Sequence, residues 1–250
     1  MNIILNLLKI HLMIEKNGYC IIPDVFTVNE VDAMNKEIAS IDDADIYLDS
    51  KGNLRRIERF YNKTKYLNQA HLKCLEILNE KFNSNFSIFK DKYNAKPPGG
   101  EGFFSHFDGV FIFKDNFNKE KKGWYEYSDY FINVLIALDP CNLENGSLQI
   151  SNSINLNFNE LMELTKKNGT PDLNEEFEKT LLFEPIILNE GDMVLFLNTC
   201  PHKSTKNKSL IDRRTLYYTY TKGESSYYEQ YFIDKLSSKN DTSKSLSGEI

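Results

Sequence analysis

After residue 85 the sequence becomes a series of short, β-prone apolar segments separated by turn residues. The separators are Pro-Pro-Gly-Gly at residues 97–100, Asp139-Pro140, Asn145-Gly146 and Glu190-Gly191-Asp192. The segments expected to be strands are residues 87–93, 102–113, 130–138, 147–150, 182–188, 193–197 and 213–220. Many short strands at this spacing are typical of a β-sandwich or jelly roll. The pattern therefore predicts a mostly β protein with a double-sheet core.

The segment before residue 85 has the periodicity of helices instead. Thr27 and Glu30 form a capping-box pattern ahead of apolar residues at helical spacing, and residues 68–82 form a second amphipathic pattern. Residues 19–22 predict a short strand, whereas residues 42–60 look polar and irregular. We therefore expect helices that flank the β core.

The first thirteen residues, MNIILNLLKIHLM, are apolar but interrupted by polar side chains, and no small-residue cleavage site follows them. They predict a short leading helix, with translation starting at Met1 or Met13. We expect one jelly-roll domain over residues 1–236, helical to about residue 85 and with a β core to about residue 222. Residues 237–250 are too polar to pack and are expected to form a disordered tail.

The composition fits a globular protein and excludes several other classes. The 250 residues are 41% hydrophobic and 26% charged, which allows a sizeable core. A net charge of −6 argues against a nucleic-acid partner, and no apolar stretch is long enough for a membrane span. The four cysteines, at positions 20, 74, 141 and 200, form no CxxC pair and indicate buried thiols in a reducing compartment. We expect a cytoplasmic monomer or homodimer whose partner is a small-molecule substrate.

Two of the four histidines occur in a setting that suits a metal ion. His106 and Asp108 flank Phe107 in an apolar segment, and residues two apart on a strand project from the same face. His202 follows the apolar segment 193–197 and could supply a third ligand. Two imidazoles and one carboxylate form the facial triad that binds Fe(II) with open positions. A structural His-x-Asp, with the carboxylate paired to a basic residue, is the alternative that these residues leave open.

Four blocks of sequence occur in a fixed order over most of residues 15–220. They are NGY…IPDVF, YNAKPPGGEGFFSHFD, ALDP…ENGSLQI and GDMVLFLNTCPHKSTKNKS…RR. In this order and spacing they resemble the phytanoyl-CoA dioxygenase-like branch of the Fe(II)/2-oxoglutarate oxygenases, which includes ectoine hydroxylase. The resemblance implies a double-stranded β-helix, the cupin-like jelly roll. It also implies iron held by His106, Asp108 and His202, and hydroxylation that consumes O2 and releases succinate and CO2.

The same resemblance assigns residues to the 2-oxoglutarate co-substrate. The family places an arginine eleven residues after the second histidine, here Arg213, against the distal carboxylate of 2-oxoglutarate, and a guanidinium suits a carboxylate. The neighbouring Arg214 is expected to face the opposite side of its strand. Asn94, Phe103 and Ser204 match the family's co-substrate site.

The primary substrate is expected to be a small polar or anionic metabolite. Arg56, Lys96 and Trp124 are the predicted substrate contacts, and two insertions, residues 114–129 and 155–179, are expected to cover the site. Two other functional classes remain open from the sequence. One is a metal-binding cupin-type isomerase or sensor, and the other is a non-catalytic jelly-roll module that binds a ligand.

Overall fold

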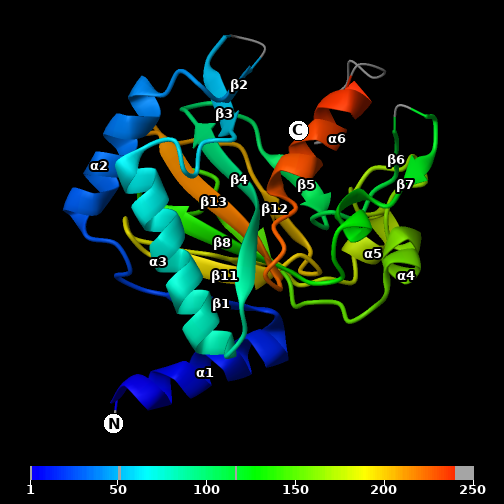
Figure 1. Cartoon of the computed structure of the whole chain (residues 1–250), viewed down its shortest axis with the longest axis horizontal. Helices are drawn as coiled ribbons and strands as arrows, with labels where there is room; N and C mark the ends of the chain where they lie inside the picture. Colours follow the sequence, from blue (N-terminus) through cyan, green and yellow to red (C-terminus); the bar gives the residue numbers. More distant parts are fainter. Residues whose placement is uncertain (1, 50–51, 116, 240–250) are drawn as a thin grey trace.

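The computed structural model describes residues 2–49, 52–115 and 117–239. Most of its strands belong to two antiparallel sheets (Figure 1). The larger sheet has the strand order β1-β11-β8-β13-β4-β3-β2. Its strands are β1 (Tyr19–Ile22), β11 (Met193–Leu197), β8 (Phe131–Ala137), β13 (Arg213–Lys222), β4 (Phe86–Lys96), β3 (Leu54–Glu58) and β2 (Asp45–Leu48). The smaller sheet comprises β10 (Glu184–Pro185), β9 (Leu148–Ile150), β12 (His202–Ser204) and β5 (Phe103–His106), in that order. This arrangement confirms the predicted jelly-roll class.

The helices lie around the two sheets. They are α1 (Asn2–Asn17), α2 (Val28–Ser40), α3 (Lys65–Phe82), α4 (Phe158–Glu163), α5 (Glu175–Glu178) and α6 (Tyr228–Lys239). Helices α2 and α3 lie along one side of the larger sheet, and α6 lies on the opposite side of the molecule from α3 and contacts β4 (Figure 1). A separate hairpin of β6 (Phe113–Lys114) and β7 (Glu120–Lys121) precedes a 3-10 helix, Gly123–Glu126.

Helix α2 begins at the predicted capping box. The Glu30 amide donates to the Thr27 hydroxyl at 3.3 Å, and the Glu30 carboxylate accepts from the Thr27 amide at 2.8 Å. At the other end of α2, the Glu37 carboxylate accepts hydrogen bonds from the amides of Tyr66 and Leu67 at 2.8 and 3.0 Å. Because these amides belong to the first turn of α3, the carboxylate of one helix caps the next.

The outer face of the larger sheet packs on α3 through apolar side chains. Leu216, Tyr218 and Tyr220 alternate along β13 and are fully buried. The Tyr218 hydroxyl donates to the carbonyl oxygen of Leu67 at 3.0 Å, and the Tyr220 hydroxyl donates to that of His71 at 3.1 Å. These hydrogen bonds satisfy the buried phenols, so the layer keeps its apolar burial without leaving a donor unpaired.

The structure differs from the predicted elements in several places, and the predicted strand 182–188 is reduced to β10, Glu184–Pro185. Residues 42–60, expected to be irregular, contain β2 and β3. The predicted strand 102–113 ends at His106, and the short strand β12 was not predicted. Helix α6 was also missed, and it continues to Lys239, three residues into the expected disordered tail. Its sequence is polar, but its aromatic residues Tyr228, Tyr231 and Phe232 are buried against the core. The remainder of that tail, residues 240–250, lies outside the described residues.

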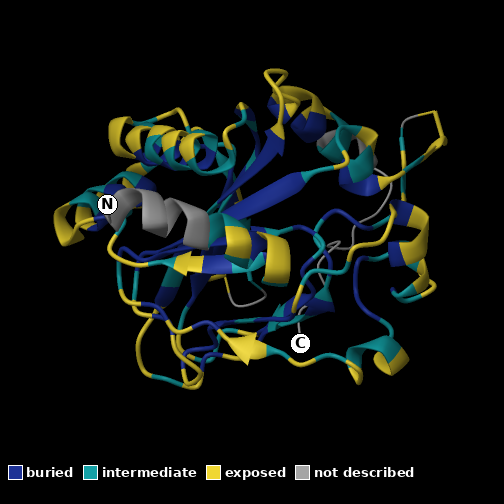
Figure 2. Cartoon of the chain, turned by 90° about the horizontal axis from the view of Figure 1, so that it is seen from below, coloured by how far each residue is buried: buried dark blue, intermediate teal, exposed yellow. Residues whose placement is uncertain are grey.

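The burial pattern places the core between the sheets and under α3. Figure 2 shows buried strands in the centre of the molecule, with exposed residues gathered on helices and loops. The leading segment forms the predicted helix, α1. Among the described residues, no helix is both long enough and apolar enough to cross a membrane.

Candidate metal centre

His106 and His202 face each other from two adjacent strands of the smaller sheet. They are direct partners in the antiparallel register of β5 and β12, and their ring centroids lie 4.2 Å apart. The Nδ1 atom of His106 is 2.8 Å from the carbonyl oxygen of Phe104, and that of His202 is 3.0 Å from the carbonyl oxygen of Cys200. Because the carbonyl oxygens accept from Nδ1, each Nε2 atom is left as a potential metal ligand.

Asp108 completes the group from a bend just beyond the end of β5. Its Oδ1 lies 3.9 Å from Nε2 of His106, and its Oδ2 lies 3.7 Å from Nε2 of His202. The three ligand atoms all lie within 4.8 Å of one another. The bend depends on Gly109, which has a φ of +80° and whose added Cβ would come within 2.6 Å of Trp124. A turn, and not the predicted strand alternation, therefore brings the carboxylate to the histidines.

Polar side chains from the larger sheet hold Asp108 in place. The Thr219 hydroxyl donates to Oδ1 of Asn133 at 2.7 Å, and Nδ2 of Asn133 donates to Oδ2 of Asp108 at 2.9 Å. The Asn198 side chain donates to the backbone oxygen of Asp108 at 3.3 Å. These supporting residues were missed from the sequence. The available signal was Asn133 itself, a polar residue in the otherwise apolar segment FINVLIA.

The electrostatics favour the protonation states that a metal requires. Burial lowers the pKa of His106 to about 4, with a further contribution from His202, so the imidazole is neutral at neutral pH. Burial alone would raise the pKa of Asp108, but the two imidazoles and nearby lysines outweigh that effect and lower it. Asp108 is therefore a carboxylate.

This donor set suits Fe(II). Two imidazole nitrogens and one carboxylate oxygen match the facial triad of non-haem iron enzymes. In the part of the chain that the structure describes, no further His, Cys, Asp or Glu joins the group. Three protein ligands would leave coordination positions open for other molecules.

A pair of buried cations lies on the inner face of the larger sheet. Arg213 of β13 and Lys96 of β4 are register partners and are 4% and 0% exposed. The Arg213 Nη2 and Lys96 Nζ atoms both donate to the carbonyl oxygen of Gly146, each at 3.2 Å. Lys96 also donates to the hydroxyl of Ser204 at 2.8 Å, and Arg213 donates to that of Thr215 at 3.1 Å.

These two cations lack acidic partners. Within the described ranges, no carboxylate lies at ion-pair distance from Arg213 or Lys96, and Nε of Arg213 is buried without a hydrogen bond. Burial and the neighbouring Arg213 lower the pKa of Lys96 to about 6, so the amine loses most of its charge at neutral pH and a bound anion would restore it. Two desolvated basic groups without a counter-charge are costly, and an anionic ligand would offset that cost.

Arg214, Asn94 and Phe103 lie on the strands around Arg213 and Lys96, but only some of them share the inner face. Arg214 faces away, with Nε and Nη2 donating to the Asp139 carboxylate at 2.8 and 2.6 Å, so the two neighbouring arginines do face opposite sides. Asn94 is buried two residues before Lys96 and shares its face of β4. Phe103 lies on β5, with the guanidinium carbon of Arg55 4.3 Å from its ring centroid. The roles of Asn94 and Phe103 stay predictions.

The predicted substrate contacts lie in three different environments. Trp124 is a core residue, 4% exposed, with the rings of Phe89 and Phe131 each 5.4 Å away. It supports Gly109 instead of forming part of an exposed lid. Arg56 lies on β3, paired with a buried carboxylate, whereas Lys96 lies beside Arg213.

The second insertion, residues 155–179, lies directly against the histidine strand. The amide of Leu173 donates to the carbonyl oxygen of Ser105 at 2.8 Å, and the amide of Phe107 donates to that of Pro171 at 3.2 Å. These contacts place the insertion beside the metal ligands. Whether it responds to substrate stays a prediction.

Two curated relatives share sequence with this chain. It is 35% identical over 149 residues to a methylphosphonate hydroxylase of Gimesia maris, covering 59% of this chain and 50% of that protein. It is 29% identical over 150 residues to a 2-aminoethylphosphonate dioxygenase of an uncultured bacterium, covering 59% of this chain and 51% of that protein. The chain thus spans about half the length of the curated relatives it matches.

Solved structures share the fold at low sequence identity. The carbocyclase SnoK of nogalamycin biosynthesis, described as non-heme and alpha-ketoglutarate-dependent, has a TM-score of 0.67 at 15% identity, covering 97% of this chain and 95% of SnoK. EctD of S. alaskensis, solved with 2-oxoglutarate and 5-hydroxyectoine, has a TM-score of 0.64 at 16% identity, covering 84% of this chain and 74% of EctD. The sequence itself matches the Phytanoyl-CoA dioxygenase (PhyH) family over residues 14–215, and because this is most of the chain, the protein belongs to that family.

Proposed function

We propose that the protein is a non-haem Fe(II)- and 2-oxoglutarate-dependent dioxygenase that hydroxylates a small anionic substrate. The observation that carries the proposal is the convergence of His106, Asp108 and His202, whose ligand atoms lie within 4.8 Å of one another. The buried and unpaired cations Arg213 and Lys96 support it, because they suit the distal carboxylate of 2-oxoglutarate.

Each side chain would have a defined role. The two histidines and Asp108 would hold iron, and Asn133 would fix the orientation of the carboxylate through its 2.9 Å hydrogen bond. Arg213 would pair with the co-substrate carboxylate. Bound iron, together with 2-oxoglutarate and O2, would supply the oxidant that converts a C–H group into C–OH while succinate and CO2 are released.

Lys96 moves from the predicted substrate contacts to the co-substrate site. Its ammonium group shares the carbonyl oxygen of Gly146 with Arg213 and is oriented by Ser204. Two basic groups around the distal carboxylate of 2-oxoglutarate would raise its affinity and fix its orientation. Ser204, which the family resemblance assigned to the co-substrate, would then act by holding Lys96.

A purely structural role for Asp108 would require a lysine or arginine beside its carboxylate. Within the described part of the chain, the only basic groups within 4.0 Å of the Asp108 carboxylate are the two histidines themselves. A purely structural aspartate in this setting would be expected to pair with a lysine or arginine. The arrangement favours metal binding over a structural role.

The substrate class follows from charge and from the relatives. The two curated relatives are a methylphosphonate hydroxylase and a 2-aminoethylphosphonate dioxygenase, both named for small phosphonates. We propose a small anionic substrate of this kind. We further propose that the protein is cytoplasmic, since Cys20, Cys74, Cys141 and Cys200 are all free and buried, as in a reducing compartment. We also propose that it is a monomer or a homodimer.

The test is succinate release coupled to product formation. Purified protein with Fe(II), ascorbate, 2-oxoglutarate and O2 is incubated with methylphosphonate, 2-aminoethylphosphonate and a panel of other small anions. We expect substrate-stimulated succinate and a product that gains one oxygen atom, with Arg214→Gln behaving as wild type. Iron-loaded protein that releases no succinate above the no-enzyme level under any condition would contradict the proposal.

A further inference from the structure

A second group of cations lies on the inner face of the larger sheet, the face that also carries Arg213 and Lys96. Lys90 and Lys92 alternate along β4 with Asn94 and Lys96, so the four side chains project from one face of the sheet. Lys92 is the register partner of Tyr217, and Lys90 is that of Thr219. Because Thr219 supports Asn133 and thereby Asp108, these lysines belong to the rows of the sheet beside the metal centre.

Arg56 joins this group from the next strand. Arg56 of β3 is the register partner of Asn94, and cross-strand partners share a face. We call Arg56, Lys90 and Lys92 the basic cluster.

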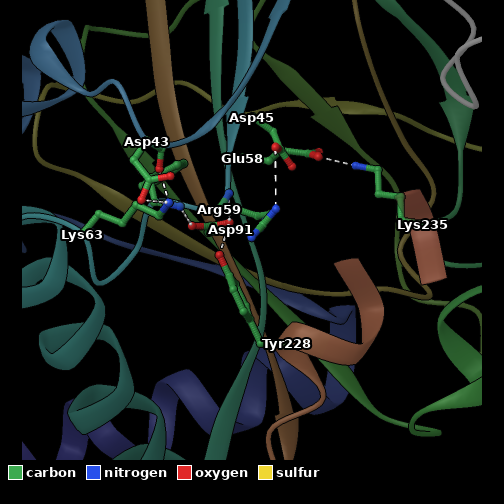
Figure 3. Close-up of polar contacts among 9 residues, drawn as sticks. Asp43, Asp45, Glu58, Arg59, Lys63, Asp91, Tyr228 and Lys235 are labelled. Carbon is green, nitrogen blue, oxygen red and sulfur yellow. Dashed lines mark hydrogen bonds and ion pairs between the residues drawn. The ribbon is translucent and has the colours of Figure 1, made fainter. Parts of the chain in front are cut away.

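The basic cluster has too little negative charge of its own. The buried Glu58 carboxylate lies 3.5 Å from Nε of Arg56 and 3.6 Å from Nζ of Lys90. It also binds Lys235 of α6, as Figure 3 shows. Lys92 is not part of this network. In the ranges that the structure describes, its ammonium group has no ion pair and no hydrogen bond, and it lies 4.6 Å from the ring centroid of Tyr217. Glu58 thus pairs with three cations, and within the described ranges the fourth, Lys92, has no carboxylate at ion-pair distance.

This imbalance costs stability unless an anion binds. Burial and the like charge of Lys90 lower the pKa of Lys92 to about 7, as expected for a cation without a counter-charge. Bound oxyanions reverse this by supplying acceptors for the ammonium hydrogens. A ligand with two negative charges would balance the cluster better than one with a single charge.

The basic cluster is separate from the co-substrate cations. Lys92 and Lys96 are four residues apart on one strand, which corresponds to about 13 Å along β4. The co-substrate would occupy the end of β4 at Lys96, beside Arg213, while Lys92 and Lys90 lie nearer the middle of the strand. The inner face of the larger sheet thus carries two separate groups of cations along β4.

We propose that Arg56, Lys90 and Lys92 bind the tetrahedral, doubly charged head group of the primary substrate, a phosphonate or a phosphate monoester. This inference rests on the proposed function for the identity of the reaction, but the binding itself does not require iron. It assigns a role to Arg56 that the sequence suggested and adds two lysines that it did not. Discrimination between a dianion and a monoanion would be the property that the cluster confers.

Calorimetric titration of the metal-free protein tests the inference. The probes are methylphosphonate in its doubly ionised form, methyl phosphate, and methanesulfonate, which has the same shape and one charge. We expect wild type to bind at least one of the two dianions at least tenfold more tightly than methanesulfonate, since hydrogen bonds between charged groups are strong. The preferred dianion identifies the head group. Failure to bind either dianion, or equal affinity for methanesulfonate, would overturn the proposal.

The decisive variant is Lys92→Met, with Lys73→Met as the matched control. Lys73 lies on α3, away from the cluster, and pairs with Glu30. We expect Lys92→Met to weaken dianion binding roughly tenfold or more and to remove the preference over methanesulfonate, while Lys73→Met retains both. Because the lost group is an unpaired cation, the melting temperature should not fall. Unchanged dianion selectivity in a folded Lys92→Met protein would contradict the role of Lys92.

Failure of this inference can be told apart from failure of the proposed function. If dianion binding depends on Lys92 but no candidate stimulates succinate release, the anion site is supported and the oxygenase function is rejected. Substrate-dependent succinate release, with dianion binding that is insensitive to Lys92, would leave the oxygenase standing and reject the basic cluster as the head-group site.

Discussion

The two faces of the seven-stranded sheet carry different kinds of side chain on the same strands. Along β13, Leu216, Tyr218 and Tyr220 point outward and pack under α3. Arg213 and Thr219 point inward, Arg213 beside Lys96 and Thr219 toward Asn133, which bonds Asp108. The outer face satisfies its buried polar groups internally. Among the described residues of the inner face, Arg213, Lys96 and Lys92 have no acidic partner at ion-pair distance. Strand alternation thus lets one element serve both stability and function.

Two buried histidines show what separates the faces. Burial lowers the pKa of both His71 and His106 to about 4. His71, under the outer face, has Nδ1 3.0 Å from the Tyr220 hydroxyl and stacks on that ring at 5.7 Å. His106 instead directs Nε2 toward another imidazole and a carboxylate. A shifted pKa is therefore shared by structural and functional histidines, and the partners of the ring distinguish them.

The largest effect on the inner face is expected from the loss of a metal-ligand candidate. Asp108→Ala should lose more than about a hundredfold of turnover, because even residues that only orient metal ligands contribute 10- to 100-fold. It should unfold no more easily than wild type, since it removes a desolvated charge. Bound iron, succinate formation and denaturant unfolding are the measurements. An Asp108→Ala protein that retains iron and turnover would remove the carboxylate from the triad.

An outer-face substitution should do the opposite. Leu216→Ala removes a fully buried side chain from β13 and should lower the free energy of unfolding by about 2–5 kcal/mol. Iron affinity of the folded protein should be unchanged, as measured by titration well below the melting temperature. A comparable loss of iron affinity would show that the two faces are not independent.

The two adjacent arginines sharpen the comparison within one dipeptide. Arg213→Gln should raise the KM for 2-oxoglutarate at least tenfold, because a charge-assisted pair contributes about 1.5–3 kcal/mol. Arg214→Gln breaks the partly exposed pair with Asp139, worth about 1 kcal/mol or less, and should leave that KM near wild type. Steady-state succinate release measures both. The reverse order would place the co-substrate on the other face of β13.

A smaller effect is expected from acid. His71 has its pKa lowered to about 4 from an ordinary value of 6.5, so the unfolded chain binds a proton more readily than the folded one. Stability should therefore fall as the pH drops from about 6.5 toward 4, through this group alone. In thermal unfolding, His71→Gln should show a shallower decline over that window than wild type. An equally steep decline in both proteins would assign the acid sensitivity elsewhere.

Chloride should have no effect at all. A small residue in place of Asp108 would remove one protein ligand and open a position that a halide could occupy. With the carboxylate present 3.9 and 3.7 Å from the two Nε2 atoms, we expect no such position. Mass spectrometry of products made with and without chloride measures this. A chlorinated product would mean that Asp108 does not bind the iron.

The sequence predicted what local spacing and ordered motifs encode. Strand-like segments gave the fold class, Thr27 and Glu30 gave the start of α2, and the His-x-Asp pair and distant His202 gave the residues that converge. Those features depend on near neighbours or on motifs that the resemblance supplied.

The remainder depends on pairings between distant strands. Thr219 reaches Asp108 only because β13 lies beside β8, where Asn133 bridges them. Lys90 and Lys92 look like ordinary surface lysines until β4 is paired with β13, which places them on the inner face. No local pattern in the sequence contains that register.

An anaerobic titration of the protein with Fe(II) and 2-oxoglutarate, followed by visible absorption, tests most directly whether His106, Asp108 and His202 hold iron. If the two histidines and Asp108 hold iron beside Arg213 and Lys96, wild type should develop the weak charge-transfer band of iron-bound 2-oxoglutarate with about one iron per chain. His202→Ala should lose the band, and His71→Gln should retain it. A band of equal intensity in His202→Ala, or its absence in iron-loaded wild type, would contradict the account.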